Sequence, residues 1–303
     1  MAWLQLKAHI DPTHAEQLET LLLDEGACAI TLEDGEDNPV FEPERGTTPL
    51  WAQTVLTGLY DDLEGIDDML ARVQQQWAIE LPDTPCPEIS YEILQDQDWT
   101  RTWMDDFEPI RMGQRLWIVP SWHEPPEPNA VNLALDPGLA FGTGTHPTTA
   151  LCLEWLDSLA VEEQLQGRSL LDVGCGSGIL AIGGLKLGAQ HACGTDIDPQ
   201  ALQASRDNAD RNNIAPDRFE LHYPEHAPKR TFDIVVANIL AGPLTEMASM
   251  IAGYVAPGGR VALSGILANQ ANDVLAAYEA QGLIMQPIAE REGWVRLTGT
   301  RRS

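Results

Sequence analysis

The sequence predicts a two-domain α/β protein, in which a small ferredoxin-like α+β domain precedes a doubly wound domain with a terminal β-hairpin. Three observations lead to this fold. The chain has 303 residues, which suits two domains of ordinary size, and 44% of them are hydrophobic, enough for a core in each. The pattern of the first part has the order βαββαβ. The second part alternates strands with helices and ends in two consecutive strands.

Residues 1–94 are expected to form the ferredoxin-like domain. Their strands alternate apolar and polar residues, and their helices carry apolar residues at intervals of three and four. The first helix follows Asp11-Pro12 and stops at Gly26, which are common start and stop signals. The expected elements are strands at Trp3–His9, Ala27–Leu32, Trp51–Leu59 and Glu88–Leu94, with a second helix marked by Ile66, Met69, Leu70, Val73 and Trp77.

Residues 95–129 are expected to connect the two domains. Aromatic residues recur at helical spacing within Asp96–Phe107, so a linker helix is predicted there. A short strand is predicted at Leu116–Pro120. Three prolines between Pro125 and Pro128 then predict a stiff, turn-rich connector.

Residues 130–303 are expected to form the doubly wound domain. A helix follows Pro147, and Asp198-Pro199 is a typical cap and first residue of another. Two strands separated by Glu290–Gly293 are expected to close the chain as a hairpin. The expected strands are Ser169–Val173, Ala192–Ile197, Phe219–His222, Phe232–Ala237, Arg260–Leu263, Leu283–Ala289 and Trp294–Thr300, and the later helices are Ile179–Leu187, Pro199–Asn212, Leu244–Val255 and Ala271–Gln281.

The chain is strongly acidic, with 46 Asp and Glu against 18 Lys and Arg and a formal net charge of −28. Such a field repels nucleic-acid phosphates and anionic lipid, so neither is expected as a direct partner, whereas a basic partner is attracted. The excess lies mostly in residues 1–108, which hold 25 acidic and 4 basic residues. Two explanations are open: an acidic domain that docks a basic partner, and an acidic surface adapted to salt.

Other features of the composition predict a cytoplasmic protein. No apolar run approaches the roughly 20 residues of a membrane span. The first seven residues alternate in polarity and lack the core of a signal peptide. The five cysteines are widely spaced without a C-x-x-C pair, as expected for reduced thiols.

A glycine-rich turn follows the strand Ser169–Val173. Glycines at positions 174, 176 and 178 permit positive φ angles and a close approach of the backbone to a ligand. A dinucleotide fingerprint would need a further glycine where this chain has Ile179. The pattern D-x-G-x-G-x-G instead resembles the first motif of class I S-adenosylmethionine-dependent methyltransferases, which places Gly174 and Gly176 at the cofactor.

Two polar residues end later strands, at the edge where doubly wound sheets bind ligands. Asp196 is placed to accept hydrogen bonds from both hydroxyls of a ribose, whereas Asp198 suits the cap of the next helix. Asn238 comes directly after the strand Phe232–Ala237, at a position where many amine and amide methyltransferases carry Asn or Asp before Pro-Pro. Here Ile-Leu follows instead. We predict a site role for Asn238, with a simple turn residue as the alternative.

Two further patterns concern ligand sites outside the glycine turn. The segment Asp-Pro-Gly-Leu-Ala-Phe-Gly-Thr-Gly-Thr-His-Pro-Thr-Thr at 136–149 is rich in glycine, but it is not a Walker A loop because no Gly-Lys-Ser/Thr follows. His222 and His226 are four residues apart, yet Pro224 prevents one helix from presenting both. No metal site is therefore predicted.

Together, the 136–149 segment, the glycine turn, the Asp196 strand end and Ala-Asn-Ile-Leu-Ala-Gly-Pro at 237–243 resemble one family, the bacterial methyltransferases that modify large-subunit ribosomal protein eleven. The resemblance covers the whole chain, because that family also carries a small ferredoxin-like domain and a linker helix before its class I methyltransferase domain. It implies S-adenosylmethionine as cofactor, with contacts at Thr145, Gly174, Asp196 and Asn238.

The resemblance also implies an activity and a partner. The activity is the transfer of several methyl groups to lysine side chains and to an α-amino group. The partner is a basic ribosomal protein, which the acidic first domain would attract. Attack requires a neutral amine, so Asn238 is expected to hold the amine and aim its lone pair, and no residue stands out as a general base.

Three alternatives remain open from the sequence. The first is another class I methyltransferase that acts on a glutamine amide, a nucleobase amine or a small molecule. The second is a nicotinamide oxidoreductase, against which Ile179 counts. The third is a cofactor-binding regulator or ribosome-assembly factor without catalysis. The acidic surface and the missing Pro-Pro after Asn238 count against a nucleic-acid substrate.

Overall fold

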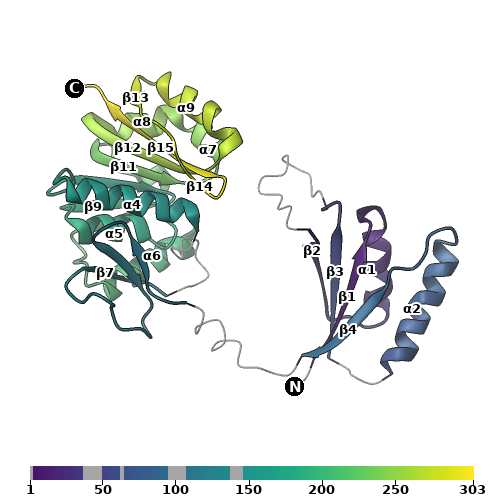
Figure 1. Ribbon diagram of the computed structural model, residues 1–303. Helices are drawn as coiled ribbons and strands as arrows, with labels where there is room; N and C mark the ends of the chain where they lie inside the picture. Colours follow the sequence, from purple (N-terminus) through teal and green to yellow (C-terminus); the bar gives the residue numbers. More distant parts are fainter. Residues whose placement is uncertain (1–2, 37–49, 62–64, 95–106, 137–145) are drawn as a thin grey trace. The chain divides into compact units, whose positions relative to one another are not determined.

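The computed structural model describes residues 3–36, 50–61, 65–94, 107–136 and 146–303. The chain divides into two compact units, residues 1–104 and 105–303 (Figure 1). The predicted linker helix over Asp96–Phe107, apart from Phe107 itself, and the predicted site residue Thr145 lie outside the described residues. No helix in the described ranges is long and apolar enough to cross a bilayer.

The first unit has the predicted ferredoxin-like arrangement. Its antiparallel sheet has the order β2-β3-β1-β4, in which β1 lies between β3 and β4 and β2 is at the edge beside β3, as this fold requires. Both helices cover one face of the sheet (Figure 1). Leu18 and Trp77 bring the two helices onto the strand residues Leu4, Leu6 and Leu56. The elements are β1 Trp3–Ile10, α1 Ala15–Asp24, β2 Ala29–Asp34, β3 Thr54–Tyr60, α2 Ile66–Glu80 and β4 Ile89–Leu94.

The second unit contains the predicted doubly wound sheet. Its strand order is β10-β9-β8-β11-β12-β15-β13, with β14 paired to β15. Strands β8 to β12 run parallel, and β15 and β13 are antiparallel, so the terminal hairpin is confirmed. The strands are β8 Ser169–Val173, β9 His191–Thr195, β10 Phe219–His222, β11 Phe232–Asn238, β12 Val255–Leu267, β13 Leu283–Met285, β14 Ala289–Arg291 and β15 Trp294–Arg301.

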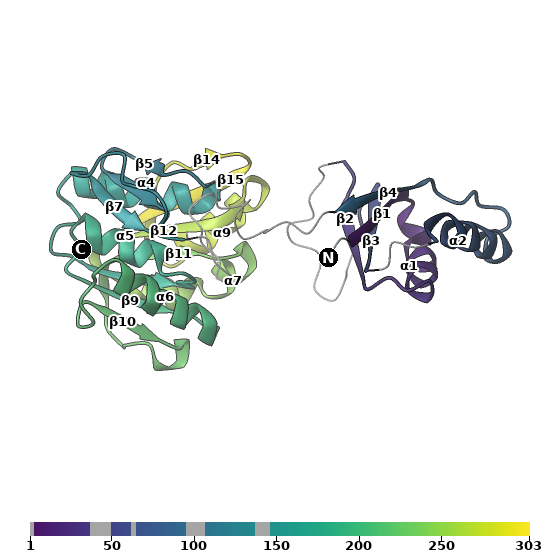
Figure 2. The ribbon, with the colours of Figure 1, turned by 90° about the horizontal axis from the view of Figure 1, so that it is seen from below.

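Helices cover both faces of this sheet (Figures 1 and 2). Neighbouring residues of one strand enter opposite cores, because side chains alternate along a strand. Leu170 packs with α4, α5 and α6, whereas Leu171 packs with α7, α8 and α9. The helices are α4 Pro147–Val161, α5 Ile179–Leu187, α6 Pro199–Arg211, α7 Ala241–Glu246, α8 Ala248–Tyr254 and α9 Ala271–Glu279.

The segment before this sheet differs from the prediction. Residues 107–129, expected as a connector, belong to the second unit. Three short strands, β5 Ile110–Met112, β6 Leu116–Val119 and β7 Val131–Ala134, form a small sheet of their own. Its buried side chains join the core beneath α4 and α5, so this segment is part of the domain rather than a spacer.

Two predicted elements are divided in the structure. The helix expected over Leu244–Val255 is two helices, α7 and α8, which meet at Met247, and Val255 already begins β12. The strand expected over Leu283–Ala289 is interrupted, so that β13 and β14 pair with different parts of β15.

Candidate active site

Parallel strands bring the predicted site residues to one edge of the large sheet. Val173 of β8 is paired with Thr195 of β9 and with Ala237 of β11. The residues that follow these three positions are therefore neighbours, and they are Gly174, Asp196 and Asn238. The carboxyl ends of β8, β9 and β11 thus form the ligand-binding edge of a doubly wound fold.

The glycine turn has the backbone conformation that only glycine adopts easily. The φ angles of Gly174, Gly176 and Gly178 are +72°, +52° and +77°. The N–H groups of Gly174 and Cys175 both donate to the Thr195 carbonyl, at 2.8 and 3.0 Å, which fastens the turn to the end of β9. A Cβ at Gly174 would overlap the Ile239 side chain, so the turns after β8 and β11 lie in contact.

Asp196 links the end of β9 to this turn. One carboxylate oxygen accepts the N–H of Gly176 at 2.9 Å, and the other accepts the N–H of Asp198 at 3.0 Å. Asp198 in turn accepts the N–H of Gln200 at 2.8 Å and caps α6, as predicted. Next to Asp196, the side chain of Ile197 is 83% exposed, an apolar residue at the site that was not predicted.

Asn238 is the last residue of β11, and the two polar atoms of its side chain have different surroundings. The N–H of the next residue, Ile239, donates to the Ser264 carbonyl of β12 at 3.1 Å. The Asn238 Nδ2 donates to the Thr149 hydroxyl at 3.3 Å. The Oδ1 of Asn238 is covered from solvent and has no hydrogen-bond partner among the described residues.

The first turn of α4 contributes a residue that we did not predict, Thr149, which is fully buried. His146 caps this helix through its Nδ1, which lies 3.3 Å from the N–H of Thr148 and 2.7 Å from the Thr148 hydroxyl. The imidazole also meets the ring of Trp294 edge-on, with centroids 4.8 Å apart. The two threonines after Pro147 were visible in the sequence, but only the fold shows that the second one faces Asn238.

Burial changes the ionisation of groups below the turn. Asp172 is fully buried, and burial raises the pKa of its carboxyl to about 7. Its Oδ2 accepts the N–H of Ala181 at 3.1 Å. Burial also raises the pKa of the Cys175 thiol, so this cysteine stays protonated.

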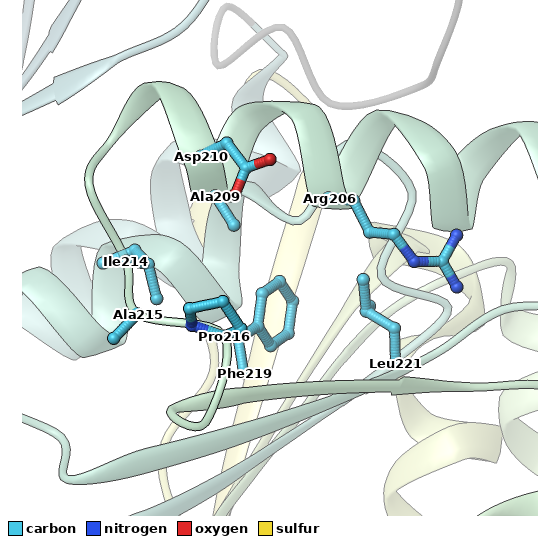
Figure 3. Close-up of a pocket in the computed structure, with 8 residues that line it drawn as sticks. All are labelled: Arg206, Ala209, Asp210, Ile214, Ala215, Pro216, Phe219 and Leu221. Atoms are coloured by element: carbon cyan, nitrogen blue, oxygen red, sulfur yellow. The ribbon is translucent and has the colours of Figure 1, made fainter.

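Two other features lie around β10, the last strand on one side of the sheet. Ligand-type atoms of Cys193, Glu220 and His222 gather within 4.8 Å of one another, but Glu220 also pairs with His191 at 3.1 Å and Arg230 at 3.2 Å. The Arg230 guanidinium already supplies positive charge there, so Glu220 does not need a metal cation to balance its charge. A hollow of about 370 Å³ lies between α6 and β10 (Figure 3), and Phe219 and Leu221 form its apolar floor. None of its lining residues belongs to the glycine turn, Asp196 or Asn238.

The residues at the sheet edge fit S-adenosylmethionine better than a dinucleotide. The glycine turn leaves room for a ligand close to the backbone, but Ile179 fills the position of the dinucleotide glycine and is buried. Asp196 is placed for a ribose, and the uncovered apolar side chain of Ile197 is placed for a flat ring. Strand order, glycine turn and acidic strand end together define a class I methyltransferase.

Comparison with known proteins agrees with this class and narrows it. The family model described as ribosomal protein L11 methyltransferase (PrmA) matches residues 2–302, so the chain belongs to that family. A ribosomal protein L11 methyltransferase from Chromohalobacter salexigens is 67% identical over 299 residues, which is 99% of each chain. The enzyme of that name from Azotobacter vinelandii is 59% identical over the full length of both.

A solved structure agrees as well. The crystal structure of a ribosomal protein L11 methylase from Lactobacillus delbrueckii subsp. bulgaricus matches with a TM-score of 0.57 and 31% identity. The match covers 65% of this chain and all of that one. The oxidoreductase and the non-catalytic regulator that the sequence left open are therefore excluded, and the protein is a methyltransferase.

Proposed function

We propose that this protein transfers methyl groups from S-adenosylmethionine to amino groups of ribosomal protein L11, namely lysine side chains and the α-amino group. Membership of the L11 methyltransferase family over residues 2–302 supports the substrate. The observation that carries the proposal at the site is the covered Oδ1 of Asn238, which lacks a partner among the described residues.

An unpaired buried acceptor is costly, by about 1–3 kcal/mol, and is retained where a ligand supplies the missing donor. An amine N–H is such a donor. Asn238 also stands beside the turn at Gly174, because their strands are paired at Ala237 and Val173. The Asn238 oxygen therefore holds the acceptor amine next to the cofactor site.

The chemistry requires a neutral amine. A free lysine has a pKa near about 10.4, so the site must favour loss of a proton, and removal of the amine from water does so by disfavouring the cation. S-adenosylmethionine, when bound, supplies an electrophilic methyl group. Asn238 accepts one N–H of the amine and aims the lone pair, and water takes the released proton. This is catalysis by positioning.

The cofactor is proposed to be held by the turn and the two strand ends. Gly174 and Gly176 bring the backbone close to its methionine part, and Asp196 accepts the ribose hydroxyls. Ile197 packs against its adenine ring. Thr145, which lies outside the described residues, remains a proposed contact from the family resemblance.

The first unit is proposed to recognise the ribosomal protein. Residues 1–104 carry 22 acidic and 4 basic residues, a field that attracts a basic partner and speeds encounter. It repels nucleic acid, which makes free L11 a better substrate than an RNA-bound one. We place the reaction in the cytoplasm, where ribosomal proteins are made.

The test is mass spectrometry of purified L11 after incubation with the full-length protein and S-adenosylmethionine. We expect increments of whole methyl groups on peptides with lysine and on the amino-terminal peptide. Increments confined to glutamine, or methylation of RNA but not of L11, would overturn the proposed substrate. An Asn238→Ala variant with unchanged rates would leave the substrate intact and overturn the role of Asn238.

A further inference from the structure

Within this site, the carboxamide of Asn238 can serve an amine only in one orientation. If Oδ1 faces the reacting amine, it accepts an N–H and leaves the lone pair free. If the amide were turned over, the Nδ2 hydrogens would face the amine and oppose a donor. The Nδ2 end of the amide therefore needs a contact that holds it away from the amine.

The structure supplies one contact that does so. Asn238 Nδ2 donates to the Thr149 hydroxyl at 3.3 Å, and this leaves Oδ1 covered and without a partner in the described part of the chain. Strand β11 fixes the backbone of Asn238, since it pairs with Ser264 of β12. The hydroxyl of Thr149 thus restrains the remaining freedom, which is rotation of the side chain, and it accepts from Nδ2 while an amine N–H takes Oδ1.

Thr149 is itself held firmly. Its side chain is fully buried, and its N–H donates to the His146 carbonyl at 3.1 Å in the first turn of α4. Two residues further along the helix, the carbonyl of Leu151 accepts a hydrogen bond from Arg296 of β15 at 2.6 Å. A hydroxyl on a braced helix is a rigid reference for a neighbouring amide.

We propose that Thr149 is a positioning residue for methyl transfer: its hydroxyl orients the Asn238 carboxamide so that Oδ1 receives the acceptor amine. This rests on the proposed role of Asn238. Thr149 acts through Asn238, so removal of its hydroxyl lowers the turnover number and leaves the fold in place.

The experiment compares full-length Thr149→Val, Thr149→Ser, Asn238→Ala and the Thr149→Val/Asn238→Ala double variant. Single-turnover methyl transfer to purified L11 is measured at saturating S-adenosylmethionine, so that slow variants still give a rate and cofactor affinity is separated from transfer. Thr298→Val is the matched control, because the Thr298 hydroxyl also contacts a carboxamide, that of Gln286 at 3.2 Å, outside the site.

We expect Thr149→Val to slow transfer by about 10- to 100-fold. Thr149→Ser should retain most of the rate, and Thr298→Val should match the wild type. In the Asn238→Ala background, Thr149→Val should have little further effect, because the amide that it orients is gone. An equal loss in both backgrounds, or a Ser variant as slow as the Val variant, would overturn the role of Thr149. Wild-type transfer by Asn238→Ala alone would overturn the role of Asn238 instead.

Discussion

The carboxylate of Asp196 accepts the backbone N–H of Gly176 over 2.9 Å and so joins the acidic strand end to the glycine turn. The two motifs are 20 residues apart in the chain. This bond holds the carboxylate at the edge where a ribose would lie, with its other oxygen on the N–H of Asp198. The proposed cofactor site is therefore already organised in the protein alone.

Replacing Asp196 by alanine should weaken S-adenosylmethionine binding by about 1–3 kcal/mol, because charge-assisted hydrogen bonds to the ribose are lost. Titration calorimetry measures this. Asp198→Ala is the control, since it removes only the cap of α6 and should lower stability but not cofactor affinity. Equal affinity in wild type and Asp196→Ala would exclude Asp196 as a cofactor ligand.

Replacing Gly174 by alanine should damage both stability and cofactor binding. A Cβ there would meet the Ile239 side chain in a residue that already has a φ of +72°. Gly282→Ala separates the two causes, because Gly282 has a φ of +83° but open space around it. That control should cost about 1 kcal/mol in a urea titration. If Gly174→Ala lowers the free energy of unfolding no more than Gly282→Ala does and binds the cofactor normally, neither stability nor binding depends on the close contact between the two turns.

The buried carboxyl of Asp172 makes stability depend on pH. Its pKa is raised from 3.8 to about 7 by burial, so ionisation is disfavoured in the folded state. The stability it contributes is fully present below pH 3.8 and is lost as the pH rises through about 7, on the order of 4 kcal/mol. Urea unfolding across this pH range should show that the free energy of unfolding depends less on pH in Asp172→Asn than in the wild type. Parallel profiles would mean that Asp172 is ionised at little cost.

Because the small β5–β7 sheet is bonded to α4, we expect a fragment of the second unit to be fully stable only if it includes this sheet. Asp157 of α4 is fully buried and accepts the N–H groups of Gln114 and Arg115 at 2.6 and 3.1 Å. A fragment of residues 105–303 keeps these bonds and should fold and bind S-adenosylmethionine. A fragment that begins at Pro128 loses these bonds together with Met112, Leu116 and Ile118, which belong to the core beneath α4 and α5, so it should be less stable by several kcal/mol. Thermal unfolding of the two fragments decides this, and equal melting temperatures would contradict it.

Much of the fold was predictable because its signals are local. The strand Ser169–Val173 and the helix Ile179–Leu187 were predicted to the residue, since a run of buried residues, a glycine turn and a helix follow one another directly. Strands β5 and β7 were missed, whereas the equally short β6 was predicted, because β6 is wholly apolar and the polar residues Arg111 and Asn132 interrupt the other two. No glycine or proline marks Met247, where the predicted helix divides.

The site was predictable only in part for a different reason. Gly174, Asp196 and Asn238 follow strands, so a sequence pattern places them at the sheet edge. Thr149 lies in the first turn of a helix, where a polar residue is usually a capping or solvent-facing residue. Its contact with Asn238 joins positions 89 residues apart and depends on how α4 packs on the sheet.

The central claim is that Asn238 chiefly holds the amine and contributes little to cofactor affinity, and one comparison tests it most directly. The rate of methyl transfer to L11 and the dissociation constant of S-adenosylmethionine are measured for wild type and Asn238→Ala. The account predicts that the transfer rate falls by about 100-fold or more while the dissociation constant changes far less. Equal losses in both quantities, or no loss in either, would contradict it.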